Sequence, residues 1–257
     1  MSDDALASRS ENEVAAWYRR LADLIDQKKI DNEKPLAPYC LRAWLDNAQN
    51  KADFVVHRNP PKHLRENPDV MSVLKYHRKV FLSQEKAKVG KGTQWAGIIP
   101  RLQGKGYTKW DGTGTLDLTY QSLVEISILK QWTGSDGEKD LLYALHGFQL
   151  HSEVSVKLLP GKSANEKIVV FEKYEAFVED IYDWDPSKHI TVPNPDYRST
   201  RSDAIEPSSD TITVYHSNAK RLERAGLAKP YTFMTTPWKV TDTAITGNAV
   251  IDPGKSL

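Results

Sequence analysis

The chain has 257 residues, long enough for one large domain or two ordinary ones. Its 35 Lys and Arg residues nearly balance 34 Asp and Glu residues, so neither a nucleic-acid ligand nor a basic partner is indicated by charge. The single cysteine, Cys40, excludes an internal disulfide and fits folding in a reducing compartment. Its place in an apolar run predicts a buried core thiol rather than a nucleophile.

The N-terminal segment is acidic and polar, and it lacks the basic start and apolar stretch of a secretory signal. We therefore expect synthesis in the cytoplasm without a signal peptide, which leaves delivery by a dedicated secretion machine open. The longest apolar runs are far short of the roughly 20 residues of a membrane-spanning helix. Any action on a membrane is expected at its surface.

Helical periodicity dominates the first third of the chain. In residues 12–27 the apolar side chains recur every three or four positions, which predicts a helix with one buried face. Pro35 and Pro38 introduce a second short helical pattern, and residues 69–82 predict a third helix. Glycines and isolated aromatic residues break every period in residues 90–114, which predicts an irregular loop.

Strand patterns begin near Leu116 and are clearest from Phe148. Residues 148–158 carry apolar side chains of one parity, and a proline-glycine turn then leads to a second long run, residues 168–182. The two runs predict a β-hairpin. Apolar residues of both parities in the second run predict a central strand covered on both faces.

The remaining segments predict shorter elements. A proline-punctuated excursion leads to a strand at residues 211–215 and a short helix at residues 217–226, with Ser217 as N-cap and Gly226 as C-terminal stop. Residues 231–240 predict a final strand, and the tail after Thr241 reads as loose.

These patterns predict an α+β fold. A mainly helical N-terminal region, residues 1–115, precedes a twisted, mostly antiparallel β-sheet domain with short helices, residues 116–257. We expect the second region to be the catalytic-like domain.

Four polar residues gather where the long strand of residues 168–182 ends. Asp180 and Tyr182 share a face of an extended strand, a bend at Asp183 returns its carboxylate toward Asp180, and His189 follows in the next loop. Neighbouring carboxylates favour a hard cation such as Mg²⁺, and histidine transfers protons near neutral pH. The group suits hydrolysis of a phosphate ester or pyrophosphate.

A structural interpretation of the same segment stands beside this one. Acidic residues and prolines at a strand end are ordinary turn chemistry, and Asp185 followed by Pro186 is a common turn initiator. In this interpretation Tyr182 and Trp184 are core aromatic residues and His189 is a surface residue.

The spacing of Asp180, Tyr182, Asp183 and His189 resembles the Asp-x-Tyr-Asp-x5-His signature of the colicin M family of bacteriocins. The likeness covers roughly residues 148–238. It implies a C-terminal catalytic domain that cleaves the undecaprenyl-pyrophosphate linkage of lipid II with Mg²⁺, with those four residues catalytic. Asp180 and Asp183 would then hold the metal or activate water, His189 transfer a proton and Tyr182 orient the phosphate.

The sequence departs from the family pattern directly after the histidine. The family has an arginine there, whereas this chain has Ile190. Either Lys188, Arg198 or Arg201 binds the substrate phosphate instead, or the protein is inactive.

The resemblance implies an antibacterial toxin that hydrolyses lipid II in the periplasm of a target bacterium. The chain is also similar in general style to cargo of type VI-like secretion systems, which implies secretion-apparatus and immunity partners.

The alternatives are a non-enzymatic secretion adaptor or immunity-type binding protein, and a nuclease, which the neutral charge disfavours. His146 and His151 lack cysteine or carboxylate partners at the spacing of a zinc site, so we expect structural roles for them. No role is assigned to His57, His63 or His77.

Overall fold

The computed structural model describes residues 6–83, 87–89, 92–94, 97–98, 115–163, 166–197 and 210–252. The chain forms two compact units, each built from three segments. Unit 1 comprises Met1–Asn67, Glu125–Phe148 and Asp180–Met234, and unit 2 comprises Pro68–Val124, Gln149–Glu179 and Thr235–Leu257. The domain boundary suggested by the sequence at residues 115 and 116 stays a prediction.

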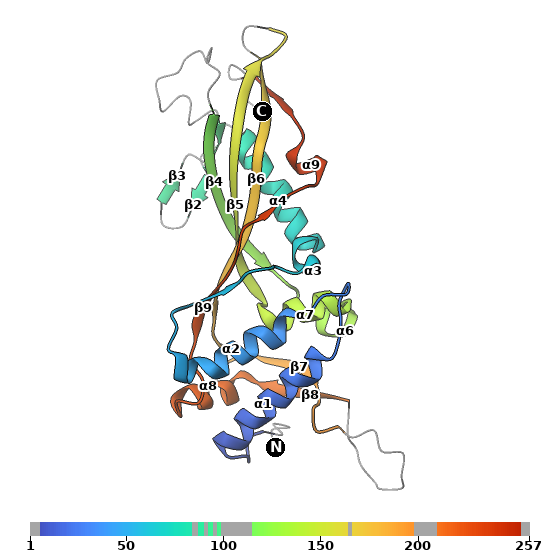
Figure 1. Cartoon of the computed structure of the whole chain (residues 1–257), viewed down its shortest axis with the longest axis vertical. Helices are drawn as coiled ribbons and strands as arrows, with labels where there is room; N and C mark the ends of the chain where they lie inside the picture. The colour runs from blue at the N-terminus through green and yellow to red at the C-terminus, as the bar shows by residue number, and fades with distance from the viewer. Residues whose placement is uncertain are drawn as a thin grey trace. The chain divides into compact units, whose positions relative to one another are not determined.

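The elements are labelled in Figure 1. The helices are α1 (Glu11–Asp26), α2 (Leu36–Asn50), α3 (Lys62–Arg65), α4 (Pro68–Leu82), α6 (Lys130–Thr133), α7 (Asp136–Ala144), α8 (His216–Arg224) and α9 (Thr243–Thr246). The strands are β1 (Phe54–His57), β2 (Ala87–Val89), β3 (Gly92–Gln94), β4 (Thr115–Glu125), β5 (Gly147–Pro160), β6 (Lys167–Tyr182), β7 (His189–Pro193), β8 (Thr211–Tyr215), β9 (Tyr231–Thr235), β10 (Trp238–Lys239) and β11 (Ala249–Ile251).

The predicted α+β fold class is confirmed. The N-terminal helices α1 and α2 precede a mixed, mostly antiparallel seven-stranded sheet with short helices. Its strand order is β1-β9-β6-β5-β4, and β10 and β11 also pair with β6. The hairpin predicted from two long runs is β5 and β6, which pair antiparallel from Gln149↔Glu179 to Pro160↔Lys167. None of the helices in the described part of the chain combines the length and apolar character needed to cross a membrane.

A β-bulge explains why the β6 sequence is apolar on both parities. Ser155 pairs with Lys173 while the next residue, Val156, pairs with Phe171, so Glu172 is an extra residue on β6. Side chains of odd number are buried before the bulge, as at Val169, and those of even number after it. The predicted cover on both faces is therefore not the reason for the pattern.

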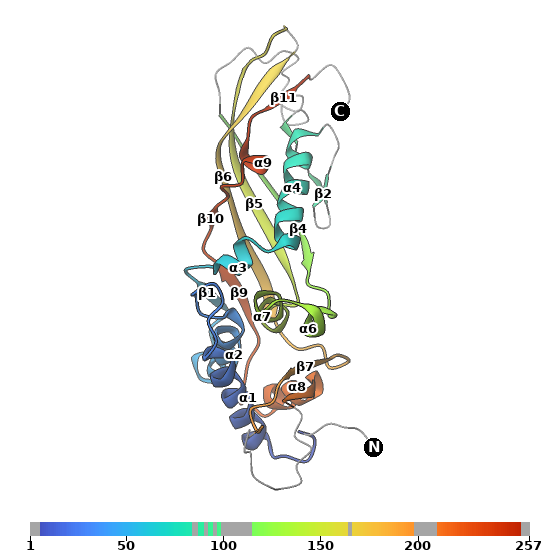
Figure 2. The ribbon, with the colours of Figure 1, turned by 90° about the vertical axis from the view of Figure 1, so that its right-hand side faces the viewer.

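In unit 2, α4 lies along the face of the sheet formed by β4, β5 and β6 (Figure 2). Its buried side chains recur at helical spacing: Val70, Leu74, His77, Val80 and Phe81. His77 is completely buried, and its Nδ1 and Nε2 each lie 2.7 Å from a serine hydroxyl, of Ser152 on β5 and Ser122 on β4. Both ring nitrogens are thus satisfied inside the core, a role that the sequence did not indicate.

The C-terminal tail is ordered as far as it is described, so the prediction of a loose tail was wrong. Residues of β11 pair with the start of β6, with Ala249 opposite Val169. Arg78 of α4 holds the segment from α9 to β11 by donating to the carbonyl oxygens of Ile245 and Gly247 at 2.6 and 2.7 Å. These are long-range interactions, which local composition does not reveal.

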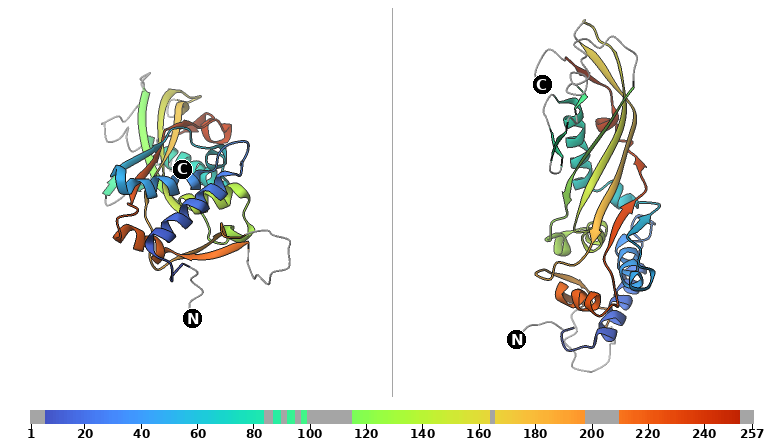
Figure 3. Two further views of the ribbon diagram at one scale, coloured as in Figure 1. Left: turned by 60° about the horizontal axis from the view of Figure 1, so that its bottom comes forward. Right: turned by 90° about the vertical axis from the view of Figure 1, so that its left-hand side faces the viewer.

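In unit 1, α1 packs against α2 (Figure 3). The predicted first helix begins one residue earlier than expected, after a capping box of Ser10 and Glu13. It buries Trp17 and Tyr18, and Tyr18 meets Trp44 of α2 edge-on with ring centroids 5.6 Å apart. Cys40 is buried in α2, as predicted.

The first turn of α2 is capped by a residue distant in sequence. Its N-cap position is Pro35, which offers no side-chain acceptor to the helix. Asp140 of α7 accepts hydrogen bonds from the backbone N–H groups of Leu36 (2.6 Å) and Ala37 (2.9 Å). The Nε2 atom of His63 on α3 lies 2.7 Å from the same carboxylate. One buried carboxylate therefore joins three helices.

Several elements differ from the sequence-based expectations. His189, expected in a loop, and the first residues of the proline-punctuated excursion expected over residues 192–197 belong to β7, which pairs with β8 as a separate two-stranded sheet. The expected strand over residues 231–240 is divided into β9 and β10, since Pro237 has no N–H to donate. Helix α8 begins at His216, so Ser217 is not its N-cap, while Gly226 takes a left-handed φ of 71° just beyond the helix, as predicted. Helix α7 was not expected.

Residues 90–114 lie largely outside the described residues, and with them Trp95 and Trp110. The described part of this range includes β3, which pairs with β2 as a hairpin where a loop was expected.

Removing the Asp140 carboxylate should destabilise unit 1. Asp140→Ala leaves two helix N–H groups and the His63 ring without their acceptor, so we expect a loss of roughly 3 kcal/mol or more in the free energy of unfolding. Urea denaturation followed by tryptophan fluorescence measures it. Asp136→Ala on the same helix, whose side chain is 63% exposed, is the control and should cost less than about 0.5 kcal/mol. Equal losses would contradict this role of Asp140.

His77 should make unit 2 sensitive to acid. Burial lowers the pKa of its imidazole to about 3, and the nearby His151 contributes to the shift. Between this value and about 6.5 the unfolded chain binds a proton that the folded chain does not, so stability falls as pH decreases through that window. We expect His77→Asn to reduce the slope of unfolding free energy against pH by up to about 1.4 kcal/mol per unit. Val80→Ala, which removes no titratable group from the same helix, is the control and should lower stability without changing the slope.

Candidate functional site

Strand alternation at the end of β6 separates the motif residues onto two faces. Asp180 and Tyr182 point inward with Val178, whereas Ile181 is 67% exposed and the Asp183 side chain 55% exposed. The shared face expected for Asp180 and Tyr182 is therefore present.

Tyr182 lies inside the core of unit 1. Only 6% of the residue is exposed, and its ring stacks on Tyr231 at 5.3 Å with an interplanar angle of 17°. The Tyr231 hydroxyl donates to the Cys40 carbonyl oxygen at 3.0 Å. Burial raises the pKa of Tyr182 well above its ordinary value, so its phenol stays protonated. A substrate phosphate would meet this hydroxyl only after rearrangement of the aromatic core.

Asp180 lies in an environment that disfavours its charged form. Burial raises the pKa of its carboxyl to about 8, and the neighbouring charge of Asp183 adds to the shift, while the Ile181 backbone partly opposes it. The group is therefore largely protonated at neutral pH. A carboxylic acid of this kind can donate a proton to a leaving oxygen.

Asp183, with a 55% exposed side chain, lies near the partly buried Lys220. The Nζ atom of Lys220, on α8, lies 4.0 Å from Asp183 and 2.8 Å from Glu223. The closer contact with Glu223 holds the ammonium near Asp183. From this position the Lys220 ammonium could form an ion pair with a phosphate oxygen of a substrate bound near Asp183.

The segment after Asp183 is a tight turn, as the structural interpretation predicted. One oxygen of Asp185 accepts hydrogen bonds from the Ser187 N–H (3.0 Å) and hydroxyl (2.7 Å), and these bonds lower the pKa of Asp185. Lys188 closes the turn through its N–H, and its Nζ atom lies 3.9 Å from the other Asp185 oxygen. Trp184 packs against Tyr18, Trp44, Tyr182 and His216, so it is a core aromatic residue.

His189 begins β7 with an exposed ring that lies 5.6 Å from the ring of Tyr215. Within the described ranges, no hydrogen bond or ion pair joins it to Asp180 or Asp183. Ile190, which stands where the family has arginine, is only 7% exposed and pairs with Val214. The apolar side chain thus fits a buried strand position. Arg198 and Arg201 lie outside the described residues.

A histidine that the sequence did not single out lies beside the motif. The ring of His216 meets Trp184 edge-on at 4.8 Å, and burial lowers its pKa to about 4 although the Asp185 backbone favours the charged form. Neither ring nitrogen has a hydrogen-bond partner of normal geometry in the described structure. No local pattern marked this residue, because its position depends on the packing of α8.

The donor set for a metal ion is small. Across the described ranges, no group of three or more His, Cys, Asp or Glu side chains is arranged to hold a metal. Two carboxylates, Asp180 and Asp183, would have to hold Mg²⁺ together with water and substrate oxygens, which is a coordination that Mg²⁺ accepts. The protonation of Asp180 competes with this role.

No protein-family model, curated protein or solved structure matches this chain.

Replacing Asp180 should stabilise the protein, with an effect that grows with pH. The folded state retains a proton on Asp180 that the unfolded chain releases near pH 4, so wild-type stability falls as pH rises from about 4 to 8. We expect the free energy of unfolding of Asp180→Asn to exceed that of wild type by roughly 1 to 3 kcal/mol at pH 8. At pH 4.5 the two values should differ little. Urea denaturation at both pH values checks this. Asp53→Asn, with an 84% exposed side chain, is the control and should change the free energy of unfolding at pH 8 by less than about 0.5 kcal/mol.

Proposed function

We propose that this protein hydrolyses a phosphate ester or pyrophosphate, and that its substrate is the undecaprenyl-pyrophosphate-linked peptidoglycan precursor lipid II. The supporting observation is the contrast between two carboxyl groups three residues apart. Burial keeps Asp180 protonated, whereas Asp183 is exposed to solvent. A buried carboxylic acid near an exposed carboxyl group is typical of hydrolase sites that use two carboxyl groups in different roles.

In the proposed reaction, water attacks the phosphorus atom and the bond to the leaving oxygen breaks. Asp180 donates its proton to that oxygen, and Asp183 orients the water. Lys220, 4.0 Å from Asp183, is the described cation best placed to meet phosphate oxygens. The resemblance to the colicin M family instead implies that Lys188, Arg198 or Arg201 binds the phosphate and that His189 transfers the proton.

Mg²⁺ is a proposed cofactor, held by Asp180 and Asp183, and it would neutralise charge on the phosphate. A cation between these groups favours the ionised form of Asp180. The acid role and the metal-binding role of Asp180 therefore differ in their expected pH dependence. An acid role gives activity that declines above about pH 8, where the proton is lost.

The same proposal makes the protein an antibacterial effector. It would be made in the cytoplasm, delivered by a type VI-like apparatus to the periplasm of a target cell, and neutralised by an immunity partner. Lipid II presents its pyrophosphate at the membrane surface.

A non-enzymatic adaptor or immunity-type binding protein is the second candidate. Two observations favour a binding protein. Tyr182 is buried, so part of the motif has a structural role, and one surface turn exposes apolar side chains. In that turn Leu129 is 66% and Trp132 61% exposed, as expected of a surface that binds a partner.

The deciding experiment measures release of water-soluble pyrophosphoryl product from lipid II by the full chain, with Mg²⁺ and with a chelator. We expect turnover by wild type and a loss of at least about 100-fold in Asp180→Asn and in Asp183→Asn. Asp53→Asn is the matched control and should retain full activity.

His189→Ala tests whether His189 or Asp180 transfers the proton. Loss of turnover in this variant would assign the proton transfer to His189. A folded wild-type protein without turnover under any metal condition would contradict the enzymatic proposal and favour the adaptor.

A further inference from the structure

Unit 1 contains a cavity that the phosphate chemistry does not use. Its volume is about 270 Å³. It is lined by Ile25, Lys28, Ile30, Pro35, Gln131, Asp136, Lys139, Asp140, Tyr143, Pro193, Asp210 and Thr211. Pockets for drug-sized ligands span about 300–1,000 Å³, so a ligand here would be small.

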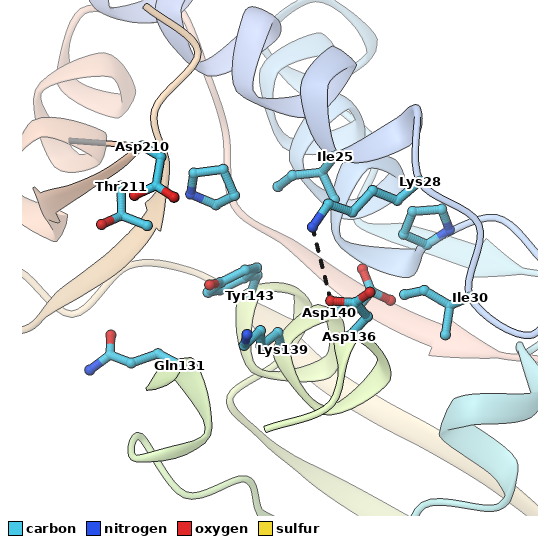
Figure 4. Close-up of a pocket in the computed structure, with 12 residues that line it drawn as sticks. Ile25, Lys28, Ile30, Gln131, Asp136, Lys139, Asp140, Tyr143, Asp210 and Thr211 are labelled. Atoms are coloured by element: carbon cyan, nitrogen blue, oxygen red, sulfur yellow. Dashed lines mark ion pairs between the residues drawn. The ribbon is translucent and has the colours of Figure 1, made fainter. Parts of the chain in front are cut away.

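Most of the charge around the cavity is already compensated. Both oxygens of Asp140 accept hydrogen bonds from the first turn of α2, and His63 adds a third. Lys28 and Asp136 pair at 3.9 Å, the contact drawn as a dashed line in Figure 4. One charged group of each sign remains, Lys139 and Asp210, and neither has an ion-pair partner among the described residues.

Two neutral groups add directed hydrogen-bonding capacity. The Oε1 atom of Gln131 accepts from the Thr191 N–H at 2.9 Å, which leaves the amide nitrogen of Gln131 as a donor. Burial raises the pKa of Tyr143 to about 12, and nearby Asp136 adds to the shift, so Tyr143 keeps its hydroxyl proton. In Figure 4 the side chains of Gln131, Lys139 and Tyr143 lie across the cavity from Asp210.

The remaining wall is apolar. Ile25 and Ile30 are 6% and 9% exposed, and Pro35 and Pro193 contribute ring surfaces. A lining of this kind takes an aliphatic group, whereas the polar groups fix its orientation. The cavity therefore combines an ammonium, a carboxylate and an apolar surface within a small volume.

We propose that this cavity binds a small zwitterion with an aliphatic side chain, the chemistry of a free amino acid. The ligand carboxylate meets Lys139 and the Gln131 amide, the ligand ammonium meets Asp210, and the aliphatic group contacts the isoleucines. A net anion or cation leaves one of the two charged groups without a counterpart, which disfavours its binding. The site is independent of the hydrolase proposal, because it shares no residue with Asp180 and Asp183.

The test is calorimetric titration of the full chain with L-leucine, with L-leucinamide, which lacks the carboxylate, and with N-acetyl-L-leucine, which lacks the ammonium. We expect L-leucine to bind with a dissociation constant on the order of 1 mM or tighter. Each analogue should bind at least about tenfold more weakly, since each loses one charge-assisted contact.

Variants assign the two contacts. Lys139→Gln should weaken L-leucine at least about tenfold and remove the preference for L-leucine over L-leucinamide. Asp210→Asn should remove the preference over N-acetyl-L-leucine. Lys162→Gln and Asp53→Asn, exposed charges outside the cavity, are the matched controls and should bind as wild type does.

Absence of L-leucine binding to wild type at about 10 mM would overturn the proposal, as would equal affinity for all three compounds. If a cavity variant fails to fold, the affinities of wild type for the three compounds still show whether the cavity binds a zwitterion selectively.

Discussion

The architecture of unit 1 depends on the carboxylate of Asp140. Helix α2 starts directly after Pro35, whose side chain cannot accept from the exposed N–H groups of the first turn. Asp140 supplies both acceptors from α7, and His63 completes its hydrogen bonding. A buried carboxylate with three donors is stable, but the loss of any partner leaves a desolvated polar group. Helices α2, α3 and α7 are therefore held as one arrangement.

The environment of the proposed catalytic acid follows from that arrangement. Because Cys40 lies in α2, its carbonyl oxygen is placed to accept a hydrogen bond from the Tyr231 hydroxyl. The Tyr231 ring in turn stacks on the ring of Tyr182. The resulting aromatic core borders the end of β6, where Asp180 is removed from water. The raised pKa of Asp180 is thus a property of tertiary packing around the strand end, and the four-residue motif by itself does not produce it.

This difference explains which features the sequence could predict. Helices α1 and α4 and strand β5 follow from periodicity within one segment, and the shared face of Asp180 and Tyr182 follows from strand alternation. The β6 bulge requires the register against β5, and the contacts of Asp140 with α2 join residues more than 100 positions apart. The depth of Tyr182 and the place of His216 likewise depend on elements distant in sequence. Local patterns contain no information about such contacts.

Two aspartates in unit 1 show how burial distinguishes structure from chemistry. Asp140 is enclosed with two backbone donors and an imidazole, so its charge strengthens the fold. Asp180 is also largely withdrawn from water, but its neighbouring charge is the carboxylate of Asp183, and its ionised form is disfavoured. A sequence selected for stability alone gains nothing from an acidic residue in the second environment, since asparagine has nearly the same shape and no charge to desolvate. A carboxyl group in this position has a cost in stability, and this cost is the strongest physical argument for chemistry at the end of β6.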